Sequence, residues 1–180
     1  MSEKVVLVDK FDNEIGIMEK MEAHQKGLLH RAISVFIFNS YGQMLIQRRA
    51  LEKYHSPGKW SNAACTHPRL NEAPVEAAKR RLKEEMGMTT EINFGFKFIY
   101  KADLDQKLIE HELDHVFMGF SNDIPEYNAK EVCDFKYVSK GDLENDLEKN
   151  PNSYSEWFKL CYKKAFKSVN KLENQKLDVH

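Results

Sequence analysis

The chain has 180 residues, 42% of them hydrophobic, and its 27 basic and 28 acidic side chains give a formal net charge of -1. This length and composition favour one domain, and the balanced charge excludes a global field that would attract nucleic acid or an anionic membrane. The longest mainly apolar run, residues 32–38, is far shorter than the ~20 residues that cross a bilayer. The N-terminal segment lacks the apolar core of a signal peptide. We therefore expect a cytoplasmic protein without a membrane or nucleic-acid partner.

The three cysteines are odd in number and form no closely spaced pair of the CxxC type. This usage argues against a disulfide framework and is typical of a reducing compartment. Thiol chemistry is therefore available to Cys65, Cys133 and Cys161.

The first elements in chain order are short strands. Residues 5–8 and 11–16 are predicted to form two strands around a turn. Residues 32–39 have the apolar run of a strand that is buried on both faces. The turn at residues 40–42 then leads into a strand at 44–48, so this part of the chain predicts a β-hairpin.

Residues 74–86 give the clearest helix. Proline suits the first helical turn, and glycine suits the position just past the end. Apolar residues recur between them at helical spacing, and they are Val75, Ala78, Leu82 and Met86.

Strands at residues 94–100 and 108–120 and a helix at 153–169 complete the predicted elements. Strands and helices interleave without a strict βαβ rhythm, which favours a mixed β-sheet flanked by helices, an α/β protein of the α+β type. We expect a single compact domain over residues 1–169, followed by a polar, flexible tail at 170–180.

Two carboxylates in the strand at 108–120 are candidate metal ligands. The strand period of two places Glu110 and Glu112 on one face and His111 on the other. Cys65 and His67 repeat this spacing if their segment is extended. The alternative for the glutamates is a solvated strand face, because the sequence around them is strongly polar.

His24 and His30 stand six residues apart in a segment that also holds Lys20. Several imidazoles combined with two carboxylates would suit Mn²⁺, Zn²⁺ or Mg²⁺, and ligand type does not choose among these ions. Each lone histidine could equally be a surface or capping residue.

Basic residues gather at Arg48, Arg49 and Lys53, and Arg81 lies one helical turn before Glu85. Arginine can bind diphosphate oxygens in a bidentate manner, and a neighbouring carboxylate can hold a bridging Mg²⁺. Arg81 and Glu85 could also form an exposed salt bridge worth ~0.2–0.5 kcal/mol. Charge patterning by itself favours the salt bridge.

Residues 66–88 resemble a degraded Nudix box. Thr66 occupies the position of its first glycine, and Arg81 occupies a position where Nudix hydrolases carry glutamate. Loss of that acid weakens the metal cluster used for hydrolysis, whereas an arginine suits binding of a diphosphate without cleavage. The box residues that do match are Glu72, Arg80, Leu82, Glu84, Glu85, Gly87 and Met88.

The substitution at Arg81, the segment RRALEKYHSPGKWSNAACTHP and the segment IEHELDHVF are together similar to the type I isopentenyl-diphosphate isomerases. The resemblance extends over residues 5–157. It implies a Nudix-like fold and interconversion of isopentenyl diphosphate and dimethylallyl diphosphate in isoprenoid biosynthesis. The implied partner is this small isoprenoid diphosphate, while the oligomeric state stays open.

The resemblance implies that the catalytic residues are Cys65, Glu112 and Tyr100. One departure from the family pattern is the spacing of His24 and His30, which is one residue shorter than we expect for bacterial members. The implied metal ligands are His24, His30, His67, Glu110 and Glu112, holding Mn²⁺, Mg²⁺ or Zn²⁺.

Glu85 matches the ligand of a second ion, a Mg²⁺ that arrives with the substrate. The implied substrate-binding residues are Lys20, Arg49, Lys53, Arg81 and Trp157, of which Trp157 is the aromatic wall of the pocket.

We expect Glu112 and Cys65 to face each other across the substrate, one delivering and one removing a proton. The preferred assignment has Glu112, with Tyr100, as the donor to isopentenyl diphosphate and Cys65 as the base, and the roles exchange when the reaction reverses. An isolated cysteine would more simply be a small buried hydrophobe. Two other functions compete, a Nudix-type diphosphate hydrolase and a binding module with structural Zn²⁺.

Overall fold

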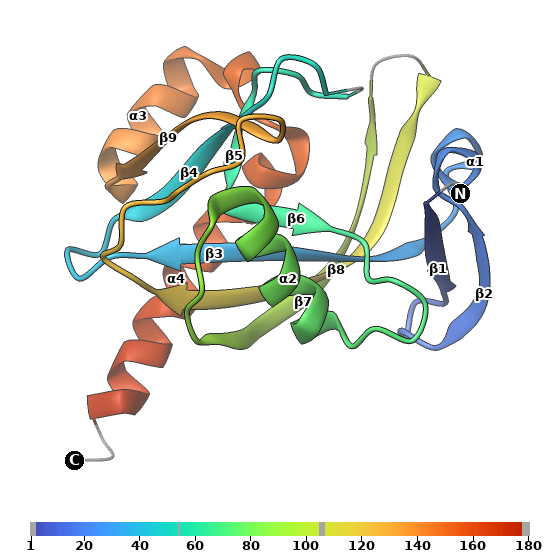
Figure 1. Cartoon of the computed structure of the whole chain (residues 1–180), viewed down its shortest axis with the longest axis horizontal. Coiled ribbons are helices and arrows are strands. Elements are labelled where there is room, and N and C mark those ends of the chain that lie inside the picture. The colour runs from blue at the N-terminus through green and yellow to red at the C-terminus, as the bar shows by residue number, and fades with distance from the viewer. Residues whose placement is uncertain (1–2, 54, 105–106, 178–180) are drawn as a thin grey trace.

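The computed structural model in Figure 1 describes residues 3–53, 55–104 and 107–177, and its side chains up to Val169. Nine strands form one curled, mixed sheet, and four α-helices flank it. The strands are β1 Lys4–Val8, β2 Glu14–Glu19, β3 His30–Phe38, β4 Met44–Arg49, β5 Trp60–Asn62, β6 Ala64–Thr66, β7 Ile92–Asp103, β8 Ile109–Phe120 and β9 Val132–Val138. The helices are α1 Lys20–Lys26, α2 Pro74–Met86, α3 Lys140–Lys149 and α4 Glu156–Leu177.

Strand β3 is the centre of the sheet. It runs antiparallel to β6 and parallel to β8, and all its residues except Arg31 are buried. Ile33, Val35 and Ile37 pack with α2, and Phe36 and Phe38 pack with α4 on the opposite face. The prediction of a strand buried on both faces is therefore confirmed, and the two helices supply the two halves of the core.

Helix α2 confirms the clearest predicted helix. It begins at Pro74, and Gly87 ends it in the left-handed conformation with a φ of 65°. A side chain at Gly87 would also be excluded by space, since a Cβ atom there would lie 2.4 Å from the carbonyl oxygen of Glu126. The end of α2 is thereby held close against the segment that follows β8.

The predicted hairpin at residues 32–48 is wrong beyond its turn. Strands β3 and β4 pair only at Phe38 and Met44, because β6 and β8 occupy the two edges of β3 along most of its length. Strand β4 pairs with β5 and β9 instead.

The C-terminal helix begins later than predicted. Residues Pro151–Ser153 form a 3₁₀ turn, Tyr154 is extended, and the Ser155 amide donates to the Trp60 carbonyl. Helix α4 then runs from Glu156 to Leu177, past the predicted domain boundary at Val169. The flexibility predicted for the tail stays a prediction, and residues 178–180 lie outside the described residues.

Elements without a strong pattern were missed in the sequence. These are α1 and α3, which are mostly polar, β5, which has three residues, and β9, whose buried and exposed residues do not alternate. In the described part of the chain, no helix combines the length and the apolar character needed to cross a membrane.

Candidate active site

Strand register places three functional side chains in one row. Glu112 on β8 is the direct partner of His30 on β3 and of Tyr100 on β7. Residues opposite each other on neighbouring strands point to the same face of a sheet. The sheet backbone therefore brings together an imidazole, a carboxylate and a phenol that are far apart in the sequence.

His24 reaches the same place from α1. Gly27 ends this helix with a φ of 60°, and the chain enters β3 at His30 after only two more residues. A Cβ atom at Gly27 would lie 3.1 Å from Ile109, so the turn needs both the conformation and the small size of glycine. The tight turn explains how the spacing of six residues still brings His24 beside His30, with ring centroids 4.8 Å apart.

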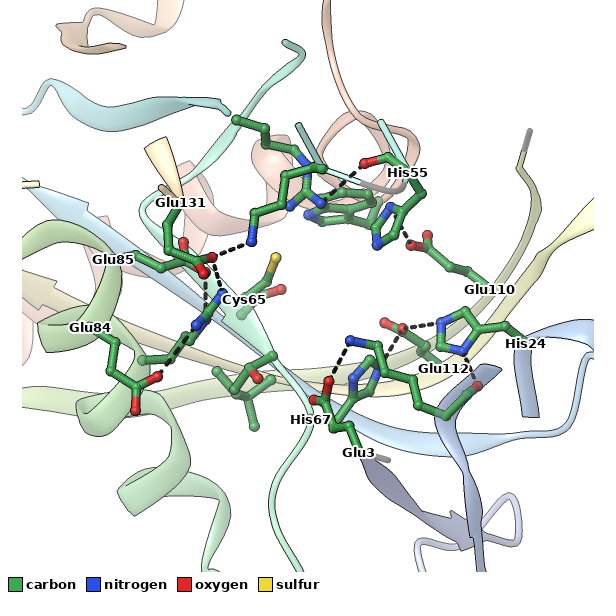
Figure 2. A pocket seen from close by; sticks show the side chains of 18 of the residues that line it. Glu3, His24, His55, Cys65, His67, Glu84, Glu85, Glu110, Glu112 and Glu131 are labelled. Atoms are coloured by element: carbon green, nitrogen blue, oxygen red, sulfur yellow. Dashed lines mark hydrogen bonds and ion pairs between the residues drawn. The ribbon is translucent and has the colours of Figure 1, made fainter. Parts of the chain in front are cut away.

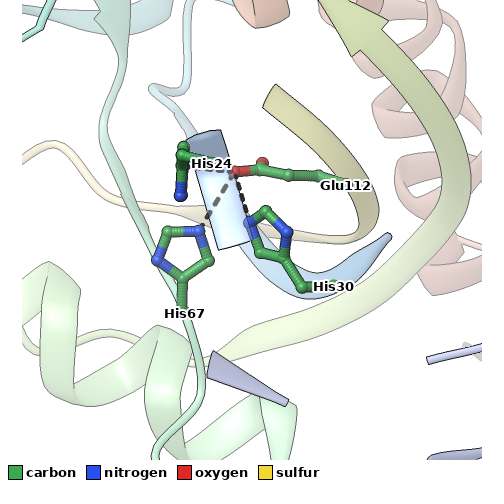
Figure 3. A group of neighbouring side chains, drawn as sticks. All are labelled: His24, His30, His67 and Glu112. Atoms are coloured by element: carbon green, nitrogen blue, oxygen red, sulfur yellow. Dashed lines mark hydrogen bonds and ion pairs between the residues drawn. The ribbon is translucent and has the colours of Figure 1, made fainter. Parts of the chain in front are cut away.

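Figure 3 shows His24, His30 and His67 around one carboxylate oxygen of Glu112. Their ligand atoms all lie within 4.8 Å of one another. The Nε2 atoms of His67, His30 and His24 lie 3.0, 3.5 and 4.0 Å from Glu112 Oε1. We call these four residues the metal cluster.

The proton positions in the metal cluster fit a bound cation. Nδ1 of His24 donates to the Lys20 carbonyl and Nδ1 of His30 donates to the Leu28 carbonyl, each at 2.8 Å. A carbonyl only accepts, so in a neutral ring Nε2 carries a lone pair. These lone pairs face a carboxylate oxygen, and Nε2 of His30 is buried without a hydrogen-bond partner among the described residues. A cation between them would satisfy all these atoms.

The carboxylates Glu110 and Glu112 share the Tyr100 hydroxyl, which donates to Glu112 at 2.7 Å and to Glu110 at 3.2 Å. Burial and the charge of Glu112 hold the pKa of Glu110 well above its usual range. Burial opposes ionisation of Glu112 too, but contacts with His30 and His67 outweigh it and hold its pKa well below the usual range. The buried pair thus carries one negative charge. Glu110 lies outside the metal cluster, with Oε1 4.0 Å from His55 Nδ1.

Cys65 lies on β6, directly opposite Ser34 of β3. Figure 2 shows its sulfur and Glu112 on different sides of one open space. Burial, with the neighbouring Glu85 carboxylate, raises the pKa of the Cys65 thiol to about 12. Burial also raises the pKa of Tyr100 well above 10. A protonated thiol facing an ionised Glu112 differs from the starting state of the preferred assignment, and that assignment stays a prediction.

Trp157 closes the apolar side of the site. Its ring is 3% exposed, and its indole N–H donates to the Asn62 side chain at 3.0 Å. The amide of Asn62 in turn donates to the backbone carbonyls of Val35 and Ala64. Asn62 therefore ties the first turn of α4 to β3 and to β6, the strand that carries Cys65, a structural role that was missed in the sequence.

Figure 2 shows Glu85 and Glu131, two ion-pair partners of Arg81, on the side of Cys65 that faces away from His67 and Glu112. Arg49 donates to the carbonyls of His55 and Ser56 at 3.2 Å, and its guanidinium carbon lies 5.2 Å from the Trp157 ring. Lys53 forms an ion pair with Glu131.

Arg81 contacts three carboxylates. Its Nη1 donates to Glu84 at 3.3 Å. Its Nε lies 2.6 Å from Glu85 and its Nη2 donates to Glu131 at 2.5 Å. The Arg81–Glu85 salt bridge favoured by charge patterning exists, but the Glu85 side chain is only 4% exposed and also accepts from Gln47. Burial makes this pair part of the cavity wall rather than a surface ion pair.

Two matched Nudix-box residues serve the fold. Arg80 donates to both carboxylate oxygens of Glu72, at 2.6 and 2.9 Å. Since Glu72 also accepts from the Arg69 amide at 2.7 Å, the pair fastens the loop before α2 to the helix.

One cavity of about 410 Å³ contains most of the predicted site. His30 lies behind its wall in the metal cluster. Further lining residues were missed in the sequence, among them Glu3, His55 and Glu131. Each is a single polar residue in a polar stretch, without a periodic signal. The predicted residues that line the cavity are Lys20, His24, Arg49, Lys53, Cys65, His67, Arg81, Glu85, Tyr100, Glu110, Glu112 and Trp157.

The fold has known relatives. A NUDIX domain model matches residues 28–161. DR0079 from Deinococcus radiodurans superimposes with a TM-score of 0.74 at 17% identity, covering 89% of this chain and 98% of that one. A MutT protein from Methanosarcina mazei gives 0.62 at 19% identity, covering 79% and 96%. The fold and the family match define a NUDIX-domain protein.

Sequence relatives narrow the class. Isopentenyl-diphosphate Delta-isomerase 2 of Aromatoleum aromaticum is 48% identical over 161 residues, covering 89% of this chain and 85% of the relative. Isopentenyl-diphosphate Delta-isomerase of Pectobacterium atrosepticum is 47% identical over 171 residues, covering 92% and 96%. The chain belongs to the isopentenyl-diphosphate Delta-isomerase family of NUDIX-domain proteins, and the expected mixed-sheet fold and family are confirmed.

Proposed function

We propose that this protein interconverts isopentenyl diphosphate and dimethylallyl diphosphate for isoprenoid biosynthesis in the cytoplasm. The observation that carries the proposal is one cavity with Cys65 on one side, the Glu112–Tyr100 pair on another, and cations beside them. This arrangement suits a proton gain at one carbon and a proton loss at another on a short chain held by its diphosphate.

Glu112 and Cys65 are the proposed proton carriers. One protonates the terminal alkene carbon, the other removes a proton from C2, and their roles exchange with direction. Tyr100 donates to Glu112 at 2.7 Å and so orients its carboxylate. If the step begins with a protonated Cys65 thiol and an ionised Glu112 carboxylate, the proton is available at Cys65. The reverse step starts from protonated Glu112.

Proton transfer alone supplies too little. General acid catalysis is worth about 10²–10⁴-fold, or about 3–5 kcal/mol, whereas enzymes lower barriers by ~8–23 kcal/mol. The intermediate resembles a tertiary carbocation, and the π face of Trp157 would stabilise it by ~2 kcal/mol or more in a desolvated site. Binding of the remote diphosphate supplies orientation of the short hydrocarbon tail.

The metal cluster would hold Mn²⁺, Mg²⁺ or Zn²⁺, with Glu110 as an added ligand. When bound, the ion would fix the orientation and acidity of the Glu112 carboxylate. The three histidines and Glu112 support this role, because their lone pairs already converge.

The diphosphate would bind to Lys20, Arg49, Lys53 and Arg81, together with a Mg²⁺ that it carries and that Glu85 would contact. Guanidinium groups suit this task because they bind phosphate oxygens in a bidentate manner. Arg81 also favours the isomerase over the hydrolase alternative, because it occupies a position where the Nudix box of hydrolases carries glutamate.

The test is to incubate the protein with isopentenyl diphosphate and Mg²⁺ or Mn²⁺, and to follow both dimethylallyl diphosphate and orthophosphate. We expect isomerisation without phosphate release. Release of orthophosphate or monophosphate without double-bond migration would support the hydrolase instead.

A further inference from the structure

Glu131 is an acid within the proposed diphosphate site. Its Oε2 atom accepts from both Lys53 and Arg81 Nη2, the latter at 2.5 Å. Its side chain is only 23% exposed. A carboxylate of the chain thus engages two of the cations proposed for the diphosphate.

The backbone fixes this carboxylate from two sides. The Glu131 carbonyl accepts from the Ala50 amide at 3.0 Å, at the start of the loop that carries Lys53. The Glu131 amide donates to Asn128, whose own amide donates to the Glu85 carbonyl at 2.8 Å on α2. Glu131 is therefore held between the two elements that supply its partners, unlike a surface ion pair formed only by side-chain tips.

The charge of the cavity wall determines how Glu131 affects the binding of a diphosphate. The described lining residues include seven lysines and arginines and six glutamates, and Glu110 and Glu112 share one negative charge, so the acids offset most of the positive charge before any ligand binds. A free diphosphate must compete with Glu131 for Lys53 and Arg81, and it then lies next to a displaced, partly buried carboxylate. Like charges in this position oppose binding.

A divalent cation changes this balance. Glu131 and Glu85 both contact Arg81, so the two carboxylates flank one guanidinium. When a diphosphate binds the Arg81 guanidinium, Glu131 and Glu85 both lose their contact with Arg81. A Mg²⁺ carried by the diphosphate would compensate them, directly or through its bound waters, because Mg²⁺ typically binds one or two carboxylates and substrate phosphates.

We infer that Glu131 is a specificity residue that makes the site select a Mg²⁺-bound diphosphate over a free one. The inference rests on the proposed function, since it takes Lys53 and Arg81 as diphosphate ligands. It assigns Glu131 a role in recognition of the ionic form of the substrate and none in the proton transfers.

The experiment measures binding of inorganic pyrophosphate to the folded protein by calorimetry, with and without added Mg²⁺. Wild type is expected to bind at least ten-fold tighter with Mg²⁺. Glu131→Gln is expected to bind Mg²⁺-free pyrophosphate about ten-fold tighter than wild type, because a like charge is gone. The gain from Mg²⁺ should shrink by about ten-fold or more.

Two controls separate charge from structure. Glu126→Gln makes the same charge change at an exposed residue of the same segment, outside the cavity lining, and should leave both affinities within about two-fold of wild type. Glu131→Asp keeps the charge and should keep the Mg²⁺ requirement. If Asp removes that requirement as fully as Gln does, the effect is not one of charge and the inference is wrong.

Other outcomes distinguish the inference from the function beneath it. A Glu131→Gln protein with the wild-type circular dichroism spectrum and the wild-type gain from Mg²⁺ would overturn the role of Glu131 alone. Wild-type protein that binds pyrophosphate under neither condition would overturn the proposed diphosphate site itself.

Discussion

The metal cluster and the cation group around Arg81 are assembled by different means. Strand register and hydrogen bonds to backbone carbonyls hold His24, His30 and Glu112, all of them less than a tenth exposed. The contact of Arg81 with Glu131 is an ion pair between side chains, although backbone hydrogen bonds fix the position of Glu131 itself. Proton transfer needs fixed geometry, whereas a diphosphate site can exchange its internal partners for the ligand. The cation group around Arg81 should therefore tolerate substitutions better than the metal cluster does.

Metal removal should have the largest effect on activity, because it affects every residue of the metal cluster. Chelation is expected to abolish isomerisation, and added Mn²⁺ or Mg²⁺ should restore it, while the circular dichroism spectrum stays unchanged. His30→Ala should bind less metal by elemental analysis, and His111→Asn, one residue from Glu112 but on the other face, should keep its metal. Full activity after complete removal of metal would contradict the role of the cluster.

Glu112→Gln removes the carboxylate at the centre of the row formed by His30 and Tyr100. We expect a turnover number lower by roughly 10³–10⁴-fold, near the upper range for loss of an acid–base group. The matched control is Glu148→Gln, an exposed residue of α3. Near-normal turnover of Glu112→Gln would remove it from the proton transfers.

Cys65→Ser tests the opposite side of the cavity. A hydroxyl is a much weaker acid than a thiol, so turnover should fall by roughly 10²–10³-fold with a small change in KM. Cys133→Ser, at an exposed cysteine, should behave as wild type. A fully active Cys65→Ser protein would reduce Cys65 to a packing role.

Trp157→Leu keeps an apolar wall but removes the π face. A cation–π contribution of ~2 kcal/mol corresponds to about 30-fold in turnover. Trp157→Phe should retain most of the rate, since it keeps a ring and loses only the hydrogen bond to Asn62. Equal rates for the two variants would argue against charge stabilisation by the ring.

The smallest effect is expected at the ion pair of Glu72 and Arg80, of which only Arg80 lines the cavity. A hydrogen bond from Arg80 lowers the pKa of Glu72 in the folded protein. A lowered folded-state pKa contributes stability above the unfolded pKa, about 4.3, and this contribution is lost as the pH falls through the folded value. Glu72→Gln should cost about 1 kcal/mol at neutral pH and lose less stability on acidification, as measured by urea unfolding. Identical pH profiles would contradict the assignment.

The sequence predicted local features of the site and of α2 better than the long-range pairing of strands. The period of two was enough to put Glu110 and Glu112 on one face, and proline and glycine marked both ends of α2. The hairpin failed because strand partners of β3 come from distant segments, which no local pattern encodes. Glu131 was missed for the same reason, since its partners Lys53 and Arg81 become neighbours only in the folded chain.

Resemblance to a family, rather than spacing, identified most site residues. Composition left each histidine open to a surface role, and only the fold brings His24, His30 and His67 around Glu112. The shorter spacing of His24 and His30 is accommodated by the left-handed Gly27.

The most direct test of the central claim is proton exchange in D₂O with added Mg²⁺ or Mn²⁺. The account predicts that deuterium enters the carbon skeleton of isopentenyl diphosphate or dimethylallyl diphosphate, and that Glu112→Gln and Cys65→Ser suppress its uptake. Absence of deuterium uptake by the wild-type protein with either metal would contradict the isomerase mechanism.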